Sequence, residues 1–308
     1  MYYLGASGNN SRQRTSSLLA DLVYTQRKQV VFEFLPDLYF KSGDYYLRGF
    51  LTLKKYSEKF YGIGRDTTED AEENYSFHAA RLDVSFQKRI FKRVYAGLQY
   101  EFEHNKVFEV EPGGQLETEN LLGSKAGEAS GIGLVLSWDS RDSIFFPREG
   151  KYCQASAKFF GRTLRSDYLF QRFNIDFRQY LPFFSSHVLA VQATINVISG
   201  NPPFQMLSLL GGQTLMRGYY RGRYRDKDMI VVQLEYRMPV WRRLGLVGFF
   251  GCGDVSDRLS QFRLESFKMT GGFGVRYRIQ RQQGSNLRLD FGLSRESSGV
   301  YVTVNEAF

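Results

Sequence analysis

The sequence predicts an all-β protein, a closed antiparallel transmembrane β-barrel, on three observations. Apolar and polar residues alternate through most of the chain, as they do where successive strand side chains point to opposite faces. The alternating segments run about 9–15 residues, longer than the ~5–6 typical of soluble sheets and enough for a tilted membrane strand. No apolar run approaches the ~18–20 residues that a membrane helix needs, which excludes an α-helical membrane protein.

The alternation is clearest near the C-terminus, where Val300 and Val302 share one face and Tyr301 and Thr303 share the other. Bacterial barrels normally have an even number of strands, so fifteen candidates indicate one strand too few or too many. We expect strands near residues 1–8, 14–25, 28–40, 43–55, 75–89, 91–106, 129–139, 150–164, 166–182, 186–198, 228–240, 243–254, 268–280, 285–294 and 299–308.

The connections between these segments are of two kinds. Tight turns, such as Gln26-Arg27 and residues 147–150, are typical of the periplasmic side of a barrel. Long stretches are typical of the outer side, and we expect them at residues 56–74, 107–128, 199–227 and 255–267. No linker interrupts the pattern, so residues 1–308 are expected to form a single domain.

Charge and composition narrow the function classes. The formal net charge is +9, but the basic residues are spread along the chain and alternate with apolar ones. We therefore assign them to the barrel interior and to the lipid headgroups, with no nucleic-acid partner. The start of the chain lacks the charged and apolar stretches of an export signal, so we interpret the sequence as a mature chain or an excised domain.

No catalytic, metal or cofactor site is expected. His78, His104 and His187 lie far apart without metal-ligand spacing, although a Ser–His pair of a phospholipase at His78 stays open. Cys153 and Cys252 are too few for a disulfide framework and are expected to be free thiols.

The most specific motif is Gly211-Gly212-Gln213-Thr214-Leu215-Met216-Arg217-Gly218-Tyr219. It resembles the Gly-Gly…Val-Arg-Gly-Phe/Tyr loop tip of outer-membrane assembly factors of the BamA type, also called the bacterial surface antigen superfamily. Met216 stands where that family has Val. The resemblance implies a long loop folded into the lumen, where an arginine needs a carboxylate partner and glycine allows a tight tip.

Two further patterns carry the same resemblance. Asp139, Arg141, Asp142, Pro147 and Gly150 match the family's Asp-Thr-Arg-Asp…Phe-Pro-x-x-Gly strand and periplasmic turn. The chain ends on Phe308, like the terminal strand signal that assembly machinery reads. A weaker match, residues 60–67, is closest to the branches that are fused to patatin-like lipases or stand alone.

In that family the loop arginine pairs with acids on the inner wall just after the loop. Glu235 faces the polar side by parity, so we expect Glu235 to pair with Arg217. The next strand usually carries Phe-x-Asp-x-Gly, but here Gly251 occupies the acid's position and Asp254 has the opposite parity. We therefore assign no second carboxylate partner to Arg217.

The family barrel has sixteen strands, five of them after the arginine loop. Five candidates follow residue 227 and ten precede residue 199. We expect about sixteen strands, fourteen being possible, with the first short or missing.

By this resemblance the chain is a protein of a Gram-negative outer membrane. It would act in the insertion of client proteins into that membrane or their translocation across it, and assembly machinery would insert the barrel itself. The alternatives are an anchor or translocator for an N-terminal patatin-like lipase passenger, and a passive diffusion pore. The oligomeric state stays open.

Overall fold

The computed structural model describes residues 2–4, 16–184, 186–279 and 286–308, and its regular secondary structure there is almost entirely strand. Fifteen strands form one antiparallel sheet in chain order, except that β10 pairs directly with β13. The sheet consists of β1 (Tyr2–Leu4), β2 (Ser16–Tyr24), β3 (Val30–Phe40), β4 (Tyr45–Phe60), β5 (Glu73–Phe91), β6 (Val94–Val110), β7 (Ala126–Asp139), β8 (Gly150–Phe160), β9 (Phe170–Phe183), β10 (His187–Gly200), β13 (Asp228–Trp241), β14 (Leu244–Ser256), β15 (Lys268–Arg278), β16 (Asn286–Ser294) and β17 (Ser298–Val304).

The other elements lie in the connections. The strands β11 (Ser208–Leu210) and β12 (Tyr224–Asp226) form a two-stranded ribbon between β10 and β13. The one α-helix of the described residues is α1 (Gln115–Thr118). The short 3₁₀ helices are Lys41–Gly43, Glu69–Ala71, Arg162–Leu164, Phe204–Met206, Leu259–Gln261 and Leu264–Ser266. No helix in the described part of the chain is long and apolar enough to cross a membrane.

The predicted strands are confirmed except at particular ends. The predicted first strand, 1–8, falls largely outside the described residues, which contain only the short β1. The predicted last strand ends at Val304 instead of residue 308, because Asn305 adopts a left-handed φ of 69° and the remaining residues leave the sheet. The ribbon β11–β12 was not predicted, because three residues are too few to show an alternation.

One turn was assigned to the wrong end of the sheet. Residues 25–29, between β2 and β3, lie at the same end as the long connections, whereas the β3–β4 turn lies at the opposite end. The end at which a turn lies is determined by strand parity, and not by turn length alone. We call the end that carries the connections β3–β4, β5–β6, β7–β8, β9–β10 and β13–β14 the narrow-turn end, and the other the loop end.

The sheet is apolar on its exposed face and polar on its buried face, the reverse of a soluble protein. On β7 the exposed fraction of Leu134 is 61%, whereas Glu101 on the neighbouring strand β6 is fully buried at 0%. Glu235 on β13 and Asp290 on β16 are also at 0%. An apolar exposed face on strands long enough to cross a membrane is suited to contact with lipid and not with water.

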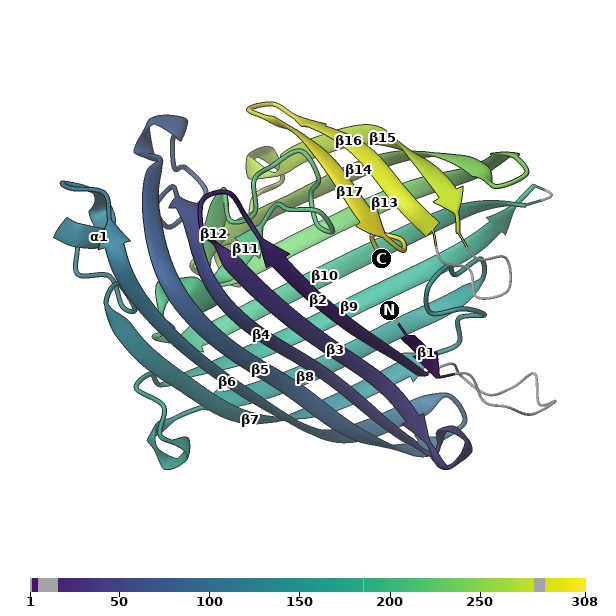
Figure 1. The fold of residues 1–308 in the computed structure, drawn as a ribbon, viewed down its shortest axis with the longest axis horizontal. Helices are drawn as coiled ribbons and strands as arrows, with labels where there is room; N and C mark the ends of the chain where they lie inside the picture. The colour runs from purple at the N-terminus through teal and green to yellow at the C-terminus, as the bar shows by residue number, and fades with distance from the viewer. Residues whose placement is uncertain (1, 5–15, 185, 280–285) are drawn as a thin grey trace.

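The sheet curls so that its two edges, β1–β2 and β16–β17, come to the same side of the molecule (Figure 1). The curl places the polar face on the inside, where the connection between β10 and β13 lies against it. Among the described residues no backbone pairing joins the first strands to β17.

Candidate functional site

The candidate site is the segment between β10 and β13, residues 201–227, which we call the Arg217 loop. The ribbon β11–β12 closes its base, and Met216, Tyr219 and Tyr224 pack with residues of β13 and β14 in one buried cluster. The phenol of Tyr224 donates to Glu296, and burial followed by this bond raises its pKa, so it stays a neutral donor. The loop is therefore packed against the sheet as part of the core and is not a solvent-exposed loop.

Arg217 is clamped between two carboxylates on different strands. Its Nη2 donates to Glu235 Oε1 on β13 at 2.5 Å, and its Nη1 donates to Asp290 Oδ2 on β16 at 2.5 Å. The guanidinium carbon lies 3.7 Å from the ring centroid of Phe249, on β14 between them. All three charged side chains are at most 1% exposed, so the attraction acts in a low-dielectric setting.

Position 251, where the family usually has an acid, is a glycine here, and a carboxylate from a later strand takes the acid's place beside Arg217. A Cβ at Gly251 would lie 3.0 Å from both the Met216 sulfur and the Thr270 methyl. Met216, which stands where the family has Val, thus occupies the space above Gly251. Asp290 supplies the second acid instead.

The tip of the loop approaches the sheet so closely that only glycine fits. Gly218 has a φ of 119°, and a Cβ there would lie 2.7 Å from the carbonyl carbon of Leu293. A Cβ at Gly292 would in turn lie 2.7 Å from the carbonyl carbon of Arg217. The Gly218 amide donates to the Tyr301 hydroxyl at 3.0 Å, so the tip is also held by β17.

A second attachment fixes the base of the loop at the loop end. Arg223 donates to the Thr67 hydroxyl at 3.1 Å and to its carbonyl at 3.0 Å, and the Gly64 amide donates to the Arg225 carbonyl at 2.8 Å. Arg65 pairs with Asp254 at 3.1 Å. Residues 60–67, the weaker sequence match, therefore tie the loop to the rest of the molecule, and Asp254 serves this attachment instead of Arg217.

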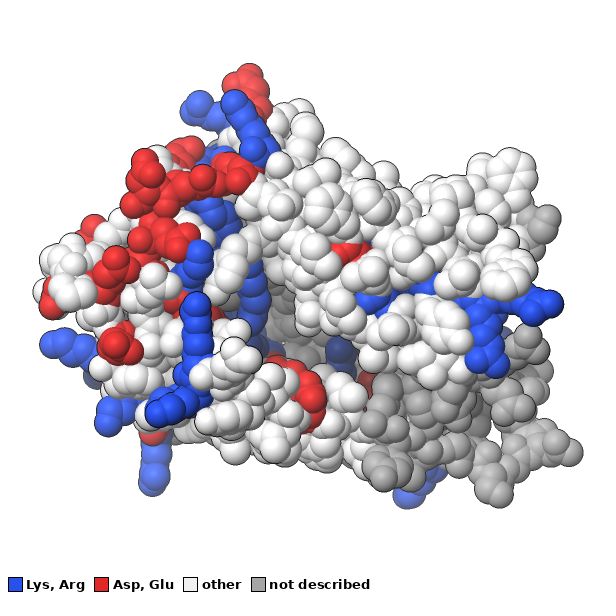
Figure 2. Space-filling model, turned by 45° about the horizontal axis from the view of Figure 1, so that its top comes forward, with Lys and Arg blue, Asp and Glu red and all other residues white. Residues whose placement is uncertain are grey.

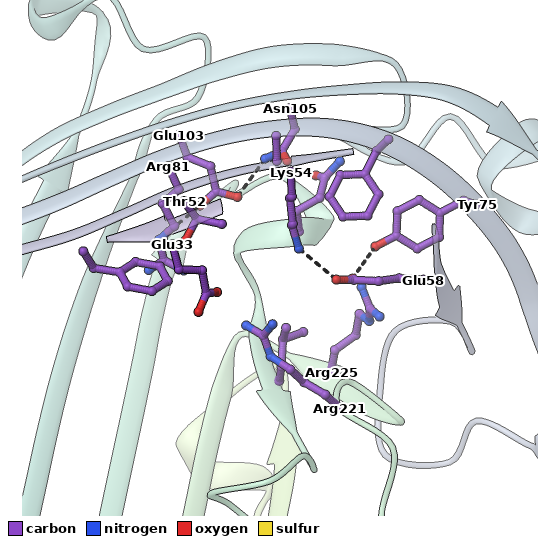
Figure 3. A pocket seen from close by; sticks show the side chains of 15 residues that line it. Glu33, Thr52, Lys54, Glu58, Tyr75, Arg81, Glu103, Asn105, Arg221 and Arg225 are labelled. Carbon is purple, nitrogen blue, oxygen red and sulfur yellow. Dashed lines mark hydrogen bonds and ion pairs between the residues drawn. The ribbon is translucent and has the colours of Figure 1, made fainter. Parts of the chain in front are cut away.

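The opposite side of the loop borders a cavity lined by β3 to β6 (Figure 3). Glu58 and Tyr75 on the wall bond to each other at 3.1 Å, and Lys54 pairs with Glu58 at 2.9 Å. Arg221 and Arg225 reach toward them from the loop. The loop is thus bound to the β13–β17 wall and leaves a polar space beside the β3–β6 wall.

The clamp continues toward the narrow-turn end as a network of alternating charges. Arg276 pairs with Asp290 and, at 2.7 Å, with Glu306, while Arg237 pairs with Glu235 at 2.8 Å. Arg237 also donates to the Phe308 carbonyl at 3.0 Å. The C-terminal residues after β17 are therefore fixed to the same buried charges as the loop.

Phe308 lies at a different place from the lipid-facing end of a strand. Its ring is 5% exposed and packs in a cluster with Tyr180, Val188 and Ala190 on β9 and β10. In the folded chain Phe308 is a core residue at the polar face.

The strand-turn motif forms a self-contained turn between β7 and β8. Asp139 accepts bonds from the Arg141 guanidinium at 2.9 and 3.0 Å. Asp142 accepts from the backbone amide of Arg148 at 2.9 Å, which closes the turn. A Cβ at Gly150, whose φ is 101°, would lie 2.4 Å from the Ser140 carbonyl oxygen, so glycine is required there. The motif residues thus shape the turn between β7 and β8.

The structure brings together Arg217, Gly218, Tyr219, Glu235 and Phe308. The strand-turn residues lie away from this group, and a contact between the two runs from Arg237 to the Pro147 carbonyl, at 3.5 Å. Sequence reasoning missed Asp290, Thr270 and the Arg237–Arg276–Glu306 network. The alternation of the sequence places all of these residues except Glu306 on polar strand faces. No local sequence pattern shows which of the polar residues contact the loop. No cluster of three or more metal-ligating side chains occurs in the described ranges.

Comparison with known proteins agrees with this architecture. A family profile for the Omp85 superfamily domain matches residues 4–306, so the chain belongs to the Omp85 superfamily. It is an outer-membrane protein of the Gram-negative type. No curated protein sequence matches the chain.

Several solved structures share the fold. BamA from Haemophilus ducreyi, lacking POTRA domains 1–3, has a TM-score of 0.62 at 12% identity over 94% of this chain and 63% of that one. CdiB from Acinetobacter baumannii has a TM-score of 0.61 at 11% identity over 94% and 53%, respectively. CdiB from Escherichia coli has a TM-score of 0.56 at 9% identity over 97% and 60%. The chain spans less than two thirds of each of these structures.

Proposed function

We infer that residues 1–308 act as one closed barrel domain whose Arg217 loop plugs the lumen. The proposed activity is insertion of client proteins into the outer membrane or their translocation across it. The observation that carries the proposal is the clamp of Arg217 between Glu235 and Asp290, which holds a buried loop against four consecutive strands.

The energetics suit a plug that is firm but releasable. Removing one partner of a buried ion pair costs about 3–5 kcal/mol, because the remaining charge is left uncompensated. If both carboxylates and the arginine separate together into a water-filled lumen, each regains solvent and the cost is smaller. The clamp therefore favours two discrete states, loop bound and loop released, over a gradual loosening.

The alternatives make different demands on the same residues. A passive pore needs an open lumen, which a loop fixed by Arg217 and Arg223 would obstruct. An anchor for a lipase passenger needs the barrel but no releasable loop. We keep the anchor as the second candidate, because residues 60–67 resemble the lipase-fused branch and hold the loop base.

The test uses the whole chain refolded into planar bilayers and vesicles. We expect low conductance from the unmodified protein and a severalfold increase from Arg217→Ala, because the loop loses its charge-assisted anchor. The matched control is Arg221→Ala, in the same loop but with no ion pair in the described chain. In the same vesicles, the unmodified chain should accelerate the folding of an added unfolded barrel protein.

Each readout can fail separately. A steady pore that is indifferent to Arg217→Ala and Glu235→Gln would mean that the plug does not exist. A quiet barrel that leaves client folding unchanged would favour the lipase anchor.

A further inference from the structure

The narrow-turn end of the sheet carries a rim of unpaired cations. The rim consists of Lys41, Lys92, Arg93, Arg148, Arg242 and Arg243, all of them exposed. None of the six forms an ion pair with another described residue, although carboxylates pair with many other described arginines. Exposed Asp142 and Glu149 lie on the same turn as Arg148, but the six cations outnumber them, so the rim has a net positive charge that faces outward.

An exposed aromatic residue stands beside these cations in turn after turn. The last residues of β3, β5 and β13 are Phe40, Phe91 and Trp241, which are 45%, 74% and 62% exposed. A cation follows each of them directly: Lys41, Lys92 and Arg242. Aromatic rings at the depth of the headgroups with cations just beyond them are the usual arrangement at a lipid interface.

The cations are not there because the turns require them. Lys41, Arg93 and Arg242 have φ values of 47°, 67° and 44°, in the left-handed region where glycine or asparagine is favoured. Lys28 and Arg165 also have a positive φ at the loop end, where β2 ends on the exposed Tyr24 four residues before Lys28 and β8 ends on the buried Phe160 before Arg165. At the narrow-turn end, side-chain chemistry takes precedence over turn geometry.

The two ends of the molecule differ in charge. In Figure 2 acidic side chains gather at the left-hand end, whereas at the right-hand end only basic ones are visible among the described residues. The loop end carries exposed acids on its long connections, namely Glu69, Asp70, Glu111, Glu117 and Glu119. The narrow-turn end therefore offers the stronger attraction for anions.

The rim also contains a groove whose lining suits a ligand with both a negative charge and an apolar part. It lies between the β7–β8 turn and the β13–β14 hairpin, where Arg148, Arg242 and Arg243 meet the apolar side chains of Phe146 and Leu244. No carboxylate lines it. The groove is continuous with the apolar outer face, since Leu244 and Leu246 on β14 are 39% and 43% exposed.

We propose that this rim binds the headgroups of anionic phospholipids, with the groove of Arg148, Arg242 and Arg243 holding one phosphodiester. The phosphate would accept from the guanidinium groups while an acyl chain follows the apolar face of β14. Short turns face the periplasm in bacterial barrels, so the lipid belongs to the periplasmic leaflet. The proposal does not depend on whether the barrel transports protein.

Trp241 is a built-in reporter for this site, because the chain has only two tryptophans. In a Trp138→Phe background, the protein is refolded into vesicles of phosphatidylcholine and phosphatidylglycerol in equal proportion. Bromine, which quenches tryptophan, is carried by one lipid at a time. We expect brominated phosphatidylglycerol to quench Trp241 more strongly than brominated phosphatidylcholine, by a factor on the order of two to five.

The preference should vanish in Arg242→Gln/Arg243→Gln and survive in the matched control, Arg258→Gln/Arg263→Gln, which removes the same charge at the loop end. Heat-modifiability verifies folding, and Arg148→Gln is the substitute if the double variant fails to fold. Equal quenching by both lipids in the unmodified protein would overturn the proposal. So would a Trp241 signal that responds to added polyglutamate but not to lipid charge, which would assign the rim to an acidic protein.

Discussion

At the scale of the residue, the clamp shows which part of a long-range contact the sequence can predict. Glu235 could be named as the partner of Arg217 because a period of two places it on the polar face just after the loop. Asp290 has the same parity, but so do many other acids. Its place beside Arg217 depends on how the loop crosses β14 and β15, which no local pattern records.

The pairing of Met216 with Gly251 makes a prediction at this scale. Gly251→Asp should destabilise the barrel by about 1–3 kcal/mol, because its side chain would overpack against the Met216 sulfur. Adding Met216→Val, which restores the family's residue, should recover most of that loss. Urea unfolding in vesicles measures both. An equal loss in the two backgrounds would mean that Met216 does not compensate for the glycine.

At the scale of the element, strands were predictable and their ends were not. Alternation located every long strand, because lipid on one side and buried charges on the other impose it. The C-terminal tail breaks the pattern. The alternation of the sequence predicts that the last strand continues to Phe308, but Phe308 packs against Tyr180 and Ala190. A strand end is decided by a competing tertiary contact, here the ion pair of Glu306 with Arg276.

Phe308 therefore has two separable roles. Phe308→Ala should cost about 3–5 kcal/mol in refolded protein, as expected for emptying a packed aromatic site. The measurement in vesicles contains no assembly machinery, so it reports packing alone. Phe308→Leu keeps most of the buried volume and is the control. A variant Phe308→Ala of unchanged stability would show that the tail contributes nothing to the folded barrel.

At the scale of the whole molecule, solvent exposure has the opposite meaning from that in a soluble protein. Charges such as Arg217 and Glu235 form the interior, and the leucines and valines form the surface. The sequence could show that the two faces differ, but a mean hydropathy of −0.36 could not show which one faces lipid. Strand length supplied that answer, because the strands are as long as a membrane is thick.

This inversion can be measured at Leu134, which is 61% exposed in the middle of β7. If lipid covers that face, Leu134→Arg should destabilise the barrel by about 2–4 kcal/mol. On a water-covered face the same substitution would stay within about 0.5 kcal/mol. Leu264→Arg is the control, because Leu264 is 88% exposed in the connection between β14 and β15 and should tolerate the charge. Equal, small effects at both positions in vesicle unfolding would mean that water covers both, and the membrane assignment of the sheet would fail with them.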